Sequence, residues 1–330
     1  MMTIKEFQDW FNVRYAELLE ETCDELGMAG RDEAVRSLLA YLSSMTEHGK
    51  RFRPYLTHVG YVTEGGEEDI FLLYAAVELL HLFCLIHDDA IDGAADRHAL
   101  PTIERHIEEV YDDETVGHAV AILAGDLVLS WAYECLDAMN LVEPYTIDEA
   151  GDIFRAAVSD VILGQLLDVL SAVAIDQTKE SIEKKIELKS ARYSFFHPLY
   201  MGMALAVADE SKELFAEEYA ISLGMAFQIE DDIRDWSQDV RAGVQTHLTW
   251  YMRNLAPSAA QEAFETYIGL EWSEDEERKL ERILEDSGAF AWAMQKAEEY
   301  YLLSEDAIFN HGKTGEEIWQ ELIDAVRNMP

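Results

Sequence analysis

Two long apolar segments with helical spacing, each carrying an Asp-Asp-x-x-Asp cluster near its end, constrain the fold of this chain more than any other feature. The first segment spans residues 70–92 with its cluster at 88–92, and the second spans residues 217–236 with its cluster at 231–235. On a helix, positions i and i+4 lie on one face, one turn apart. Two such faces turned toward each other would form a cage of oxygen ligands suited to Mg²⁺. The candidate metal ligands are therefore Asp88, Asp89, Asp92, Asp231, Asp232 and Asp235.

The acidity of the chain offers a simpler interpretation of these clusters. The chain has 66 Asp and Glu against 25 Lys and Arg, a net charge of −41. In such a chain a run of charge is usually a solvated face. Here, however, apolar residues 82–86 lead into the first cluster and apolar residues 225–229 lead into the second. Carboxylates in that setting are aimed at a cavity wall more often than at bulk solvent.

The same charge excludes several classes of partner. A chain at −41 repels nucleic acid and anionic lipid, so neither is expected to bind. Only 10 of the 330 residues are lysine, and an acid-rich, lysine-poor surface suits a salt-rich cytoplasm, where screening weakens self-repulsion. We therefore expect a halophilic protein.

The sequence shows no pattern typical of a signal peptide, a membrane span or a disulfide. Residues 1–10 carry charged side chains and no apolar h-region, so no signal peptide is expected. No apolar run approaches the roughly 18 residues of a membrane span, so no span is expected. Cys23, Cys84 and Cys135 lie far apart, without the spacing of a metal site or a disulfide. They are interpreted as core thiols in a reducing cytoplasm.

The pattern along the chain predicts an all-α fold. Residues 70–92, 116–138, 149–173 and 217–236 are apolar with helical spacing, and no segment alternates with period two. Six prolines, 18 glycines and no low-complexity linker favour a single domain over residues 1–330. Long central helices around a deep cavity are expected. The segment from residue 256 to the end is polar and amphipathic and is expected to form surface helices.

A short basic motif stands out in this base-poor chain. GKRFRP at 49–54 has three cations in four positions. It could be a solvated helix start with Pro54 near its first turn, but we favour anion capture by Lys50 and Arg53, since arginine offers bidentate geometry to phosphate oxygens. His81 lies two turns before Asp88, so both can line one cavity. A satisfied core histidine is the alternative.

Other polar residues on apolar segments need partners. Arg97 lies nine residues after Asp88 and could instead form a salt bridge in a loop. GQLLD at 164–168 and Gln228 lie within apolar helical segments, where buried polar groups must be hydrogen-bonded, for instance to a metal-bound water or a substrate. Lys189 precedes an apolar stretch and could reach inward toward a phosphate.

With these pieces in order, the chain resembles the trans-isoprenyl diphosphate synthases, also called polyprenyl synthetases, of the archaeal or haloarchaeal geranylgeranyl type. The resemblance runs from about residue 45 to 250. It rests on GKRFRP at 49–54, VELLHLFCLIHDDAID at 77–92, RHALPT at 97–102, AILAGD at 121–126, GQLLD at 164–168, KSARYSFFHPL at 189–199 and GMAFQIEDDIRD at 224–235. It implies an all-α barrel of long helices around a deep cavity, usually dimeric.

The resemblance also implies a chemistry. Mg²⁺ ions, three with the diphosphate bound, would be held by the Asp clusters and would draw charge from an allylic diphosphate until its C–O bond ionises. Isopentenyl diphosphate would then add to the allylic cation, with water excluded. The residues implied to hold isopentenyl diphosphate are Lys50, Arg53 and His81, and those implied on the allylic side are Arg97, His98, Lys189, Ser190 and Gln228.

Product length can be argued from helix geometry. Phe83 lies five residues before Asp88, roughly 7.5 Å lower at 1.5 Å per residue. Its ring would act as a floor for the growing tail, while the small Cys84 beside it leaves room. In the family this arrangement is similar to the archaeal geranylgeranyl type, so a twenty-carbon product is expected. Products of fifteen or twenty-five carbons remain open.

The chain departs from the family in two places. His98 and Ala99 stand where the family has Arg and Gly. After Asp235 the family's lysine-bearing loop is missing, and Val244 or Gln245 stands at the place of a later lysine. The main reading is an active prenyltransferase that compensates through Arg234, Arg241 or the salt-rich medium.

Two alternatives stay open. One is a weakened homologue that acts as the partner subunit of another synthase. The other is a class I terpene cyclase, which shares the ionisation step but has no need for an isopentenyl diphosphate pocket. The presence of Lys50, Arg53 and His81 argues against both.

Overall fold

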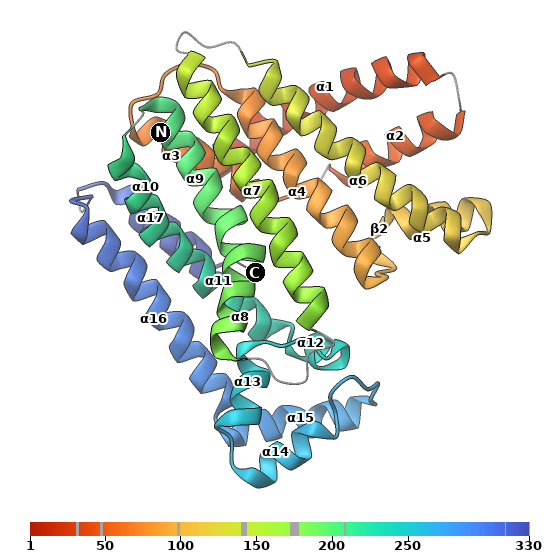
Figure 1. Ribbon diagram of the computed structural model, residues 1–330, viewed down its shortest axis with the longest axis vertical. Coiled ribbons are helices and arrows are strands. Elements are labelled where there is room, and N and C mark those ends of the chain that lie inside the picture. Colours follow the sequence, from red (N-terminus) through yellow and green to blue (C-terminus); the bar gives the residue numbers. More distant parts are fainter. Residues whose placement is uncertain are drawn as a thin grey trace. The chain divides into compact units, whose positions relative to one another are not determined.

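The computed structural model of the chain describes all residues except 31–32, 47–48, 98–99, 140–143, 172–177, 208, 314 and 330. The described part consists of helices and one ribbon of two very short antiparallel strands (Figure 1). The all-α fold predicted from the spacing of apolar residues is therefore confirmed.

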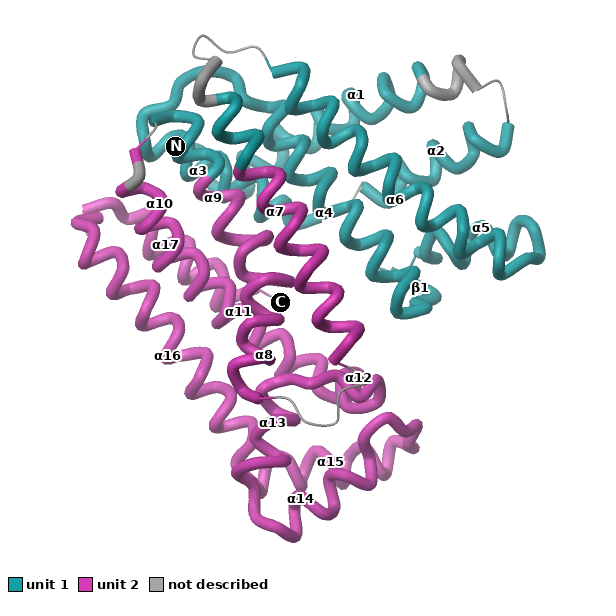
Figure 2. Tube along the Cα trace, in the orientation of Figure 1, with its two compact units in different colours: residues 1–152, 201–208 teal, residues 153–200, 209–330 magenta. Residues whose placement is uncertain are grey.

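The chain forms two compact units (Figure 2). Unit 1 contains Met1–Asp152 and Met201–Ala208, and unit 2 contains Ile153–Tyr200 and Asp209–Pro330. Two helices, α7 (Pro144–Ser171) and α9 (His197–Ala206), run from one unit into the other. The single domain expected over residues 1–330 stays a prediction.

The helices of unit 1 surround a buried central helix. In chain order the unit contains α1 (Ile4–Gly30), α2 (Glu33–Met45), α3 (Phe52–Thr63), α4 (Phe71–Asp92), β1 (Asp96–Arg97), β2 (Leu100–Pro101), α5 (Ile103–Tyr111) and α6 (Glu114–Asp137). Helix α4 is apolar on every side and packs lengthwise against α6, which in turn packs on α5 (Figure 1). The helices predicted over 70–92 and 116–138 are thus confirmed with slightly different ends.

Local chemistry explains where these helices begin and how closely they pack. Thr102 caps α5 by accepting a hydrogen bond from the backbone of Arg105, and Asp113 caps α6 in the same way. Gly125 on α6 lies against the ring of His87, where a Cβ atom would come within 2.2 Å. The absence of a side chain there lets α6 pack closely beside the acidic end of α4.

Two core helices of unit 1 resemble membrane spans in length and composition. Helices α4 and α6 are both long and apolar enough to cross a membrane, with mean hydropathy of 1.6 and 1.5 over their most apolar windows. Of those windows, 67% of α4 and 44% of α6 is buried inside the protein. Burial of this kind is what the core helices of a globular fold show, so length and composition alone do not indicate a span.

Unit 2 continues the helical pattern and adds two π-helical segments. Besides parts of α7 and α9 it contains α8 (Lys179–Ile186), η1 (Glu187–Phe196), α10 (Glu210–Ala216), η2 (Glu217–Ile221), α11 (Ser222–Arg234), α12 (Trp236–Ala242), α13 (His247–Asn254), α14 (Ser258–Glu265), α15 (Glu274–Ser287), α16 (Ala289–Asn310) and α17 (Glu317–Arg327). The continuous helix predicted over 217–236 is corrected: it begins as the π-helix η2, continues as α11 and is interrupted at Asp235.

The C-terminal helices are amphipathic, as expected, and their buried faces complete the packing of unit 2. Helix α16 packs along α11 through Ala293, Ala297 and Tyr301, all buried at one-turn spacing. Helix α17 buries Trp319 against the rings of Phe215 and Tyr219. The buried face of α16 is built largely from alanines, whose small side chains give little apolar signal in the sequence.

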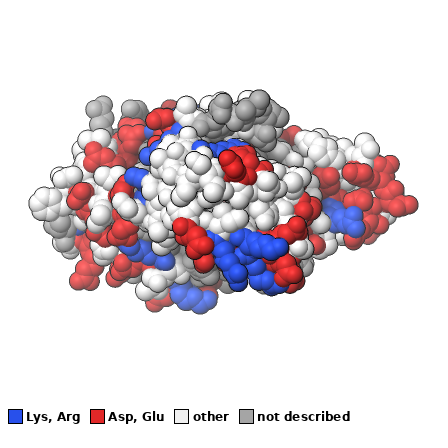
Figure 3. Space-filling view, turned by 90° about the horizontal axis from the view of Figure 1, so that it is seen from below, with Lys and Arg blue, Asp and Glu red and all other residues white. Residues whose placement is uncertain are grey.

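The surface is acidic, as the composition requires. Figure 3 shows Asp and Glu side chains spread over the face seen there, with Lys and Arg gathered in small groups. Many of the cations form ion pairs, such as Arg241 with Glu277 at 2.7 Å and Arg327 with Glu298 at 2.6 Å.

Candidate active site

In unit 1, the first Asp cluster lies at the C-terminal end of α4. Asp88 is partly exposed and Asp92 is exposed, whereas Asp89 is buried. Arg97 on β1 donates to the Asp89 carboxylate from Nε at 2.9 Å and from Nη2 at 2.7 Å, and its Nη2 lies 3.8 Å from Asp88. The salt bridge considered for Arg97 is therefore present. Because Asp89 is buried against Arg97 whereas Asp88 and Asp92 are more exposed, Asp88 and Asp92 are the better-placed metal-ligand candidates of this cluster.

The side chains below this cluster are those proposed to set product length. Phe83 is buried, and its ring centroid lies 4.6 Å from that of His87. Cys84 and His81 are half-buried on the same helix. Along α4 toward its C-terminal end, the ring of Phe83 comes first, His87 follows one turn later, and the carboxylates of the Asp cluster come last.

The basic motif begins α3 and contains an organising residue that sequence reasoning missed. Arg51 caps the helix with a left-handed backbone, φ 50°. Its buried guanidinium donates to Glu78 at 2.6 Å and to Asn12 at 2.8 Å, and also to the carbonyl of Thr46. Lys50 is exposed and Arg53 half-buried on either side of it. The signal that could have revealed this role is the acidic Glu78 in the otherwise apolar helix α4.

In unit 2, the second Asp cluster lies at the end of α11 and is reached by a chain of hydrogen bonds. Ser190 Oγ donates to Gln228 Oε1 at 2.7 Å, and Gln228 Nε2 donates to Asp232 Oδ1 at 2.8 Å. Burial raises the pKa of Asp232 to about 7. Asp231 accepts from Arg234 at 2.8 Å, and Asp235 is exposed. Asp231 and Asp235 are therefore more exposed than Asp232, as Asp88 and Asp92 are more exposed than Asp89 in unit 1.

Lys189 lies on the π-helix η1, a type of segment often found at functional sites. Its Nζ donates to Asp168 at 2.5 Å. Gly164 lets α7 approach η1, because a Cβ atom there would come within 2.4 Å of the Lys189 backbone nitrogen. The GQLLD segment thus does place a polar group, Asp168, against the predicted phosphate-binding lysine.

Two further residues near the second cluster were missed. Lys185 donates to Asp168 and to the backbone carbonyl of Gln245, each at 2.9 Å. Asp239 follows Asp235 by one turn, and burial raises its pKa to about 7 even though the charge of Lys185 opposes that shift. The four-residue spacing of Asp231, Asp235 and Asp239 and the rarity of lysine were the available signals.

The two arginines named as possible compensation for the missing loop lysine both form ion pairs within the protein. Arg234 pairs with Asp231 at 2.8 Å. Arg241 pairs with Glu277 at 2.7 Å, and its guanidinium lies 4.1 Å from the ring centroid of Trp272. Arg241 thus fastens α12 to α15 and the loop before it.

His98 and Ala99 lie outside the described residues. Within the part of the chain that is described, no three His, Cys, Asp or Glu side chains form a complete metal site by themselves.

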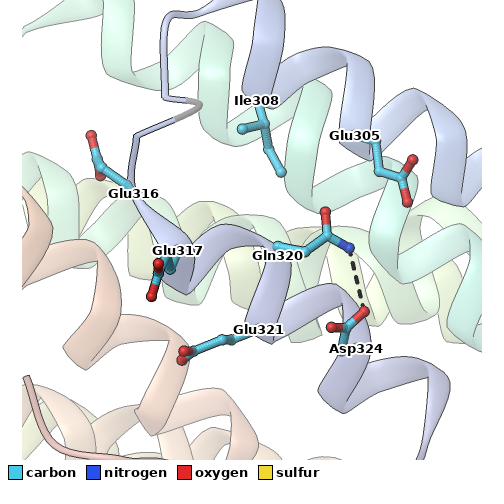
Figure 4. A pocket seen from close by; sticks show the side chains of 7 residues that line it. All are labelled: Glu305, Ile308, Glu316, Glu317, Gln320, Glu321 and Asp324. Atoms are coloured by element: carbon cyan, nitrogen blue, oxygen red, sulfur yellow. Dashed lines mark hydrogen bonds between the residues drawn. The ribbon is translucent and has the colours of Figure 1, made fainter.

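An acidic pocket of about 500 Å³ in unit 2 holds none of the predicted site residues (Figure 4). Its lining comprises Glu305, Ile308, Glu316, Glu317, Gln320, Glu321 and Asp324. The lining contains no lysine or arginine and none of the predicted site residues, so nothing assigns this pocket to the diphosphate.

Comparison with known proteins agrees with the geometry. The family model described as polyprenyl synthetase matches residues 33–246. The chain is 28% identical over 276 residues to the geranylgeranyl diphosphate synthase of Sulfolobus acidocaldarius, covering 80% of this chain and 81% of that one. It is 30% identical over 266 residues to that of Saccharolobus solfataricus, covering 76% and 77%.

The fold has close counterparts among solved structures. The geranylgeranyl pyrophosphate synthase of Corynebacterium glutamicum, complexed with isoprenyl diphosphate and magnesium, superposes with a TM-score of 0.84 at 23% identity, covering 96% of each chain. The chain therefore belongs to the polyprenyl synthetase family. Within that family it is a short-chain prenyltransferase.

Proposed function

We propose that this enzyme joins isopentenyl diphosphate to an allylic diphosphate and releases mainly geranylgeranyl diphosphate. The observation that carries the proposal is the arrangement on α4. Asp88 and Asp92 lie at the C-terminal end of this helix, and the buried ring of Phe83 lies below them. A tail extending down this helix would meet the ring roughly 7.5 Å below the metal ligands. The relatives from S. acidocaldarius and S. solfataricus carry the matching name.

Mg²⁺ fits the ligands that the two clusters offer. Asp88, Asp92, Asp231 and Asp235 present hard carboxylate oxygens, which Mg²⁺ prefers, and the C. glutamicum structure contains this ion. When bound, Mg²⁺ supplies the positive charge that stabilises the leaving diphosphate. We propose three ions, as the family resemblance implies. Diphosphate oxygens and water would complete each coordination shell, because Mg²⁺ is rarely held by protein ligands alone.

The remaining residues bind and orient the substrates. Lys50 and Arg53 flank the first turn of α3, where the helix dipole adds to their attraction for the isopentenyl diphosphate, with His81 as a further donor. Lys189 and Arg97 would bind the allylic diphosphate, and His98 could donate when protonated. Ser190 and Gln228 hold Asp232 in place, which fixes the backbone that carries Asp231.

We also propose that the enzyme is a homodimer. On α7 the apolar side chains Leu163, Leu166, Leu167 and Leu170 are exposed at a spacing that makes one helical stripe. On α6, Ile122 and Leu123 are exposed as well. A second copy covering these faces would remove them from water. The charge of −41 further suits a salt-rich cytoplasm.

The test is an elongation assay. Purified protein in high KCl with Mg²⁺ and labelled isopentenyl diphosphate would be incubated with the five-, ten- or fifteen-carbon allylic diphosphate. We expect a twenty-carbon product that disappears in Asp88→Ala. No elongation with any primer, in a protein shown to be folded, would contradict the proposal and favour a partner subunit. Product formed without isopentenyl diphosphate would favour a cyclase.

A further inference from the structure

Two lysines share one carboxylate in unit 2, and they differ in burial. Lys185 on α8 and Lys189 on η1, one turn apart, donate to different oxygens of Asp168, at 2.9 Å and 2.5 Å. The side chain of Lys185 is 8% exposed, whereas that of Lys189 is 29% exposed. The more enclosed ammonium is thus the permanent partner of Asp168, and the more exposed one is better placed to move.

Lys185 has a second fixed partner. Its Nζ donates at 2.9 Å to the backbone carbonyl of Gln245, in the segment that follows α12. Gln245 is itself buried. Lys185 therefore links α7, α8 and the segment after the second Asp cluster, and its position is set by two separate parts of the chain.

The carboxylate of Asp168 is shared by two cations. Burial acts to raise the pKa of Asp168, but the charges of Lys185 and Lys189 lower it below its usual value, so the carboxylate is ionised at neutral pH. Lys185 also interacts with the nearby Asp239. If Lys189 moved away from Asp168, the half-buried carboxylate would still have a cation beside it.

We propose that Lys185 is a positioning residue: it keeps Asp168 compensated, so that Lys189 can exchange Asp168 for the diphosphate of the allylic substrate. Without Lys185, that exchange would leave a half-buried carboxylate unpaired, and removing the buried cation of such a pair is costly. The inference rests on the proposed role of Lys189 as a diphosphate ligand.

The primary test is Lys185→Gln, which retains a hydrogen-bond donor and removes the charge. We expect the KM for the allylic diphosphate to rise about tenfold, the cost of one charge-assisted hydrogen bond. The KM for isopentenyl diphosphate should stay within about twofold, because the proposed exchange involves only the allylic diphosphate. A lysine that only holds the fold would not separate the two KM values.

A second variant decides the mechanism. Asp168→Asn removes the carboxylate that would retain Lys189. In Lys185→Gln/Asp168→Asn we therefore expect the allylic KM to return to within about twofold of Asp168→Asn alone. A double variant with an allylic KM as high as that of Lys185→Gln would overturn the proposal. A collapsed thermal unfolding temperature in Lys185→Gln would also overturn it, because it would assign Lys185 to the fold.

Two controls separate this inference from the proposed function. Lys184→Gln changes the neighbouring lysine, which is 53% exposed and pairs with Glu187, and should leave both KM values unchanged. Lys189→Ala should raise the allylic KM at least as much as Lys185→Gln. Unchanged kinetics in Lys189→Ala would refute the role of Lys189 and the exchange with it. If the wild type elongates and the Lys185→Gln variant has the same kinetics, the role of Lys185 alone is refuted.

Discussion

At the scale of single residues, the left-handed backbone of Arg51 organises the basic motif. A non-glycine residue at φ 50° costs about 1 kcal/mol or more. The buried side chain offsets that cost through its bonds to Glu78, Asn12 and Thr46. The two neighbouring cations are thereby fixed at the start of α3, so one of the three basic residues supports the other two.

The first prediction concerns Arg51→Met. It leaves Glu78 buried without its cation, so we expect the free energy of unfolding to fall by about 3 kcal/mol, measured by denaturant titration. Arg53→Met is the matched control: it should raise the KM for isopentenyl diphosphate with a much smaller loss of stability. Equal losses of stability in both variants would contradict the division of roles.

The second prediction concerns Asp239, whose pKa burial raises from the usual range of an aspartate to about 7. A carboxyl group with a raised folded-state pKa favours the folded state at low pH, and this contribution is lost as pH rises through about 7. Without divalent cations, stability should therefore fall between about pH 4 and 7. Asp239→Asn should flatten that fall and gain about 1 to 3 kcal/mol at pH 8. Glu281→Gln, on the exposed face of α15, should change neither.

At the scale of elements, the C-terminal helices complete the packing of unit 2. Helix α16 lies along α11, which carries the second Asp cluster, and α17 closes over the aromatic rings of Phe215 and Tyr219. Tyr219 Oη donates to the backbone carbonyl of Trp319 at 2.6 Å. These helices lie beyond the stretch matched by the family model and still position the site.

The third prediction tests this packing with Trp319→Ala. The indole is 0% exposed, so its removal leaves a cavity and should lower the free energy of unfolding by about 3 to 5 kcal/mol. Phe309→Ala on α16 is the control, since that ring is 75% exposed and should have little effect. Urea denaturation of both variants measures the difference.

The fourth prediction tests α4 as the wall along which the product grows. Phe83→Ala removes the buried ring and should shift the main product to longer chains, while Cys84→Phe adds a ring at the next position and should shorten it. Chromatography of the products with the fifteen-carbon primer gives the readout. An unchanged product in both variants would mean that other helices set the length.

At the scale of the whole molecule, strong acidity and exposed apolar stripes occur together. A net charge of −41 opposes association at low salt, whereas the stripe of leucines on α7 favours it. Screening at high ionic strength weakens the charge repulsion and leaves apolar burial nearly intact. Association should therefore depend on salt.

The fifth prediction follows from this balance. In high KCl we expect a dimer by light scattering, and Leu166→Glu should convert it to a monomer, because the new carboxylate would be buried in the interface. Glu180→Gln, at an exposed position of α8, should leave the dimer intact. A wild-type monomer at every salt concentration would contradict the homodimer.

Some of the site followed from helix geometry alone. The i and i+4 spacing places Asp88 and Asp92 on one face of the helix and Asp89 on another. In the structure Asp89 is buried and accepts a hydrogen bond from Arg97. The partner of Asp168 did not follow, since Lys185 and Asp168 lie 17 residues apart on different helices. The role of Arg51 was hidden for the same reason, because Glu78 lies 27 residues away.

The sequence by itself determined the helical class, the positions of both Asp clusters and the basic motif, because these depend on spacing of a few residues along one helix. Only the tertiary structure decided which charged residues form ion pairs with each other. These pairs are Arg97 with Asp89, Arg51 with Glu78, Lys185 with Asp168 and Arg241 with Glu277. It also decided that the C-terminal helices are buried on one face. Such pairings depend on helices that meet in space, and local spacing carries no information about which helices meet.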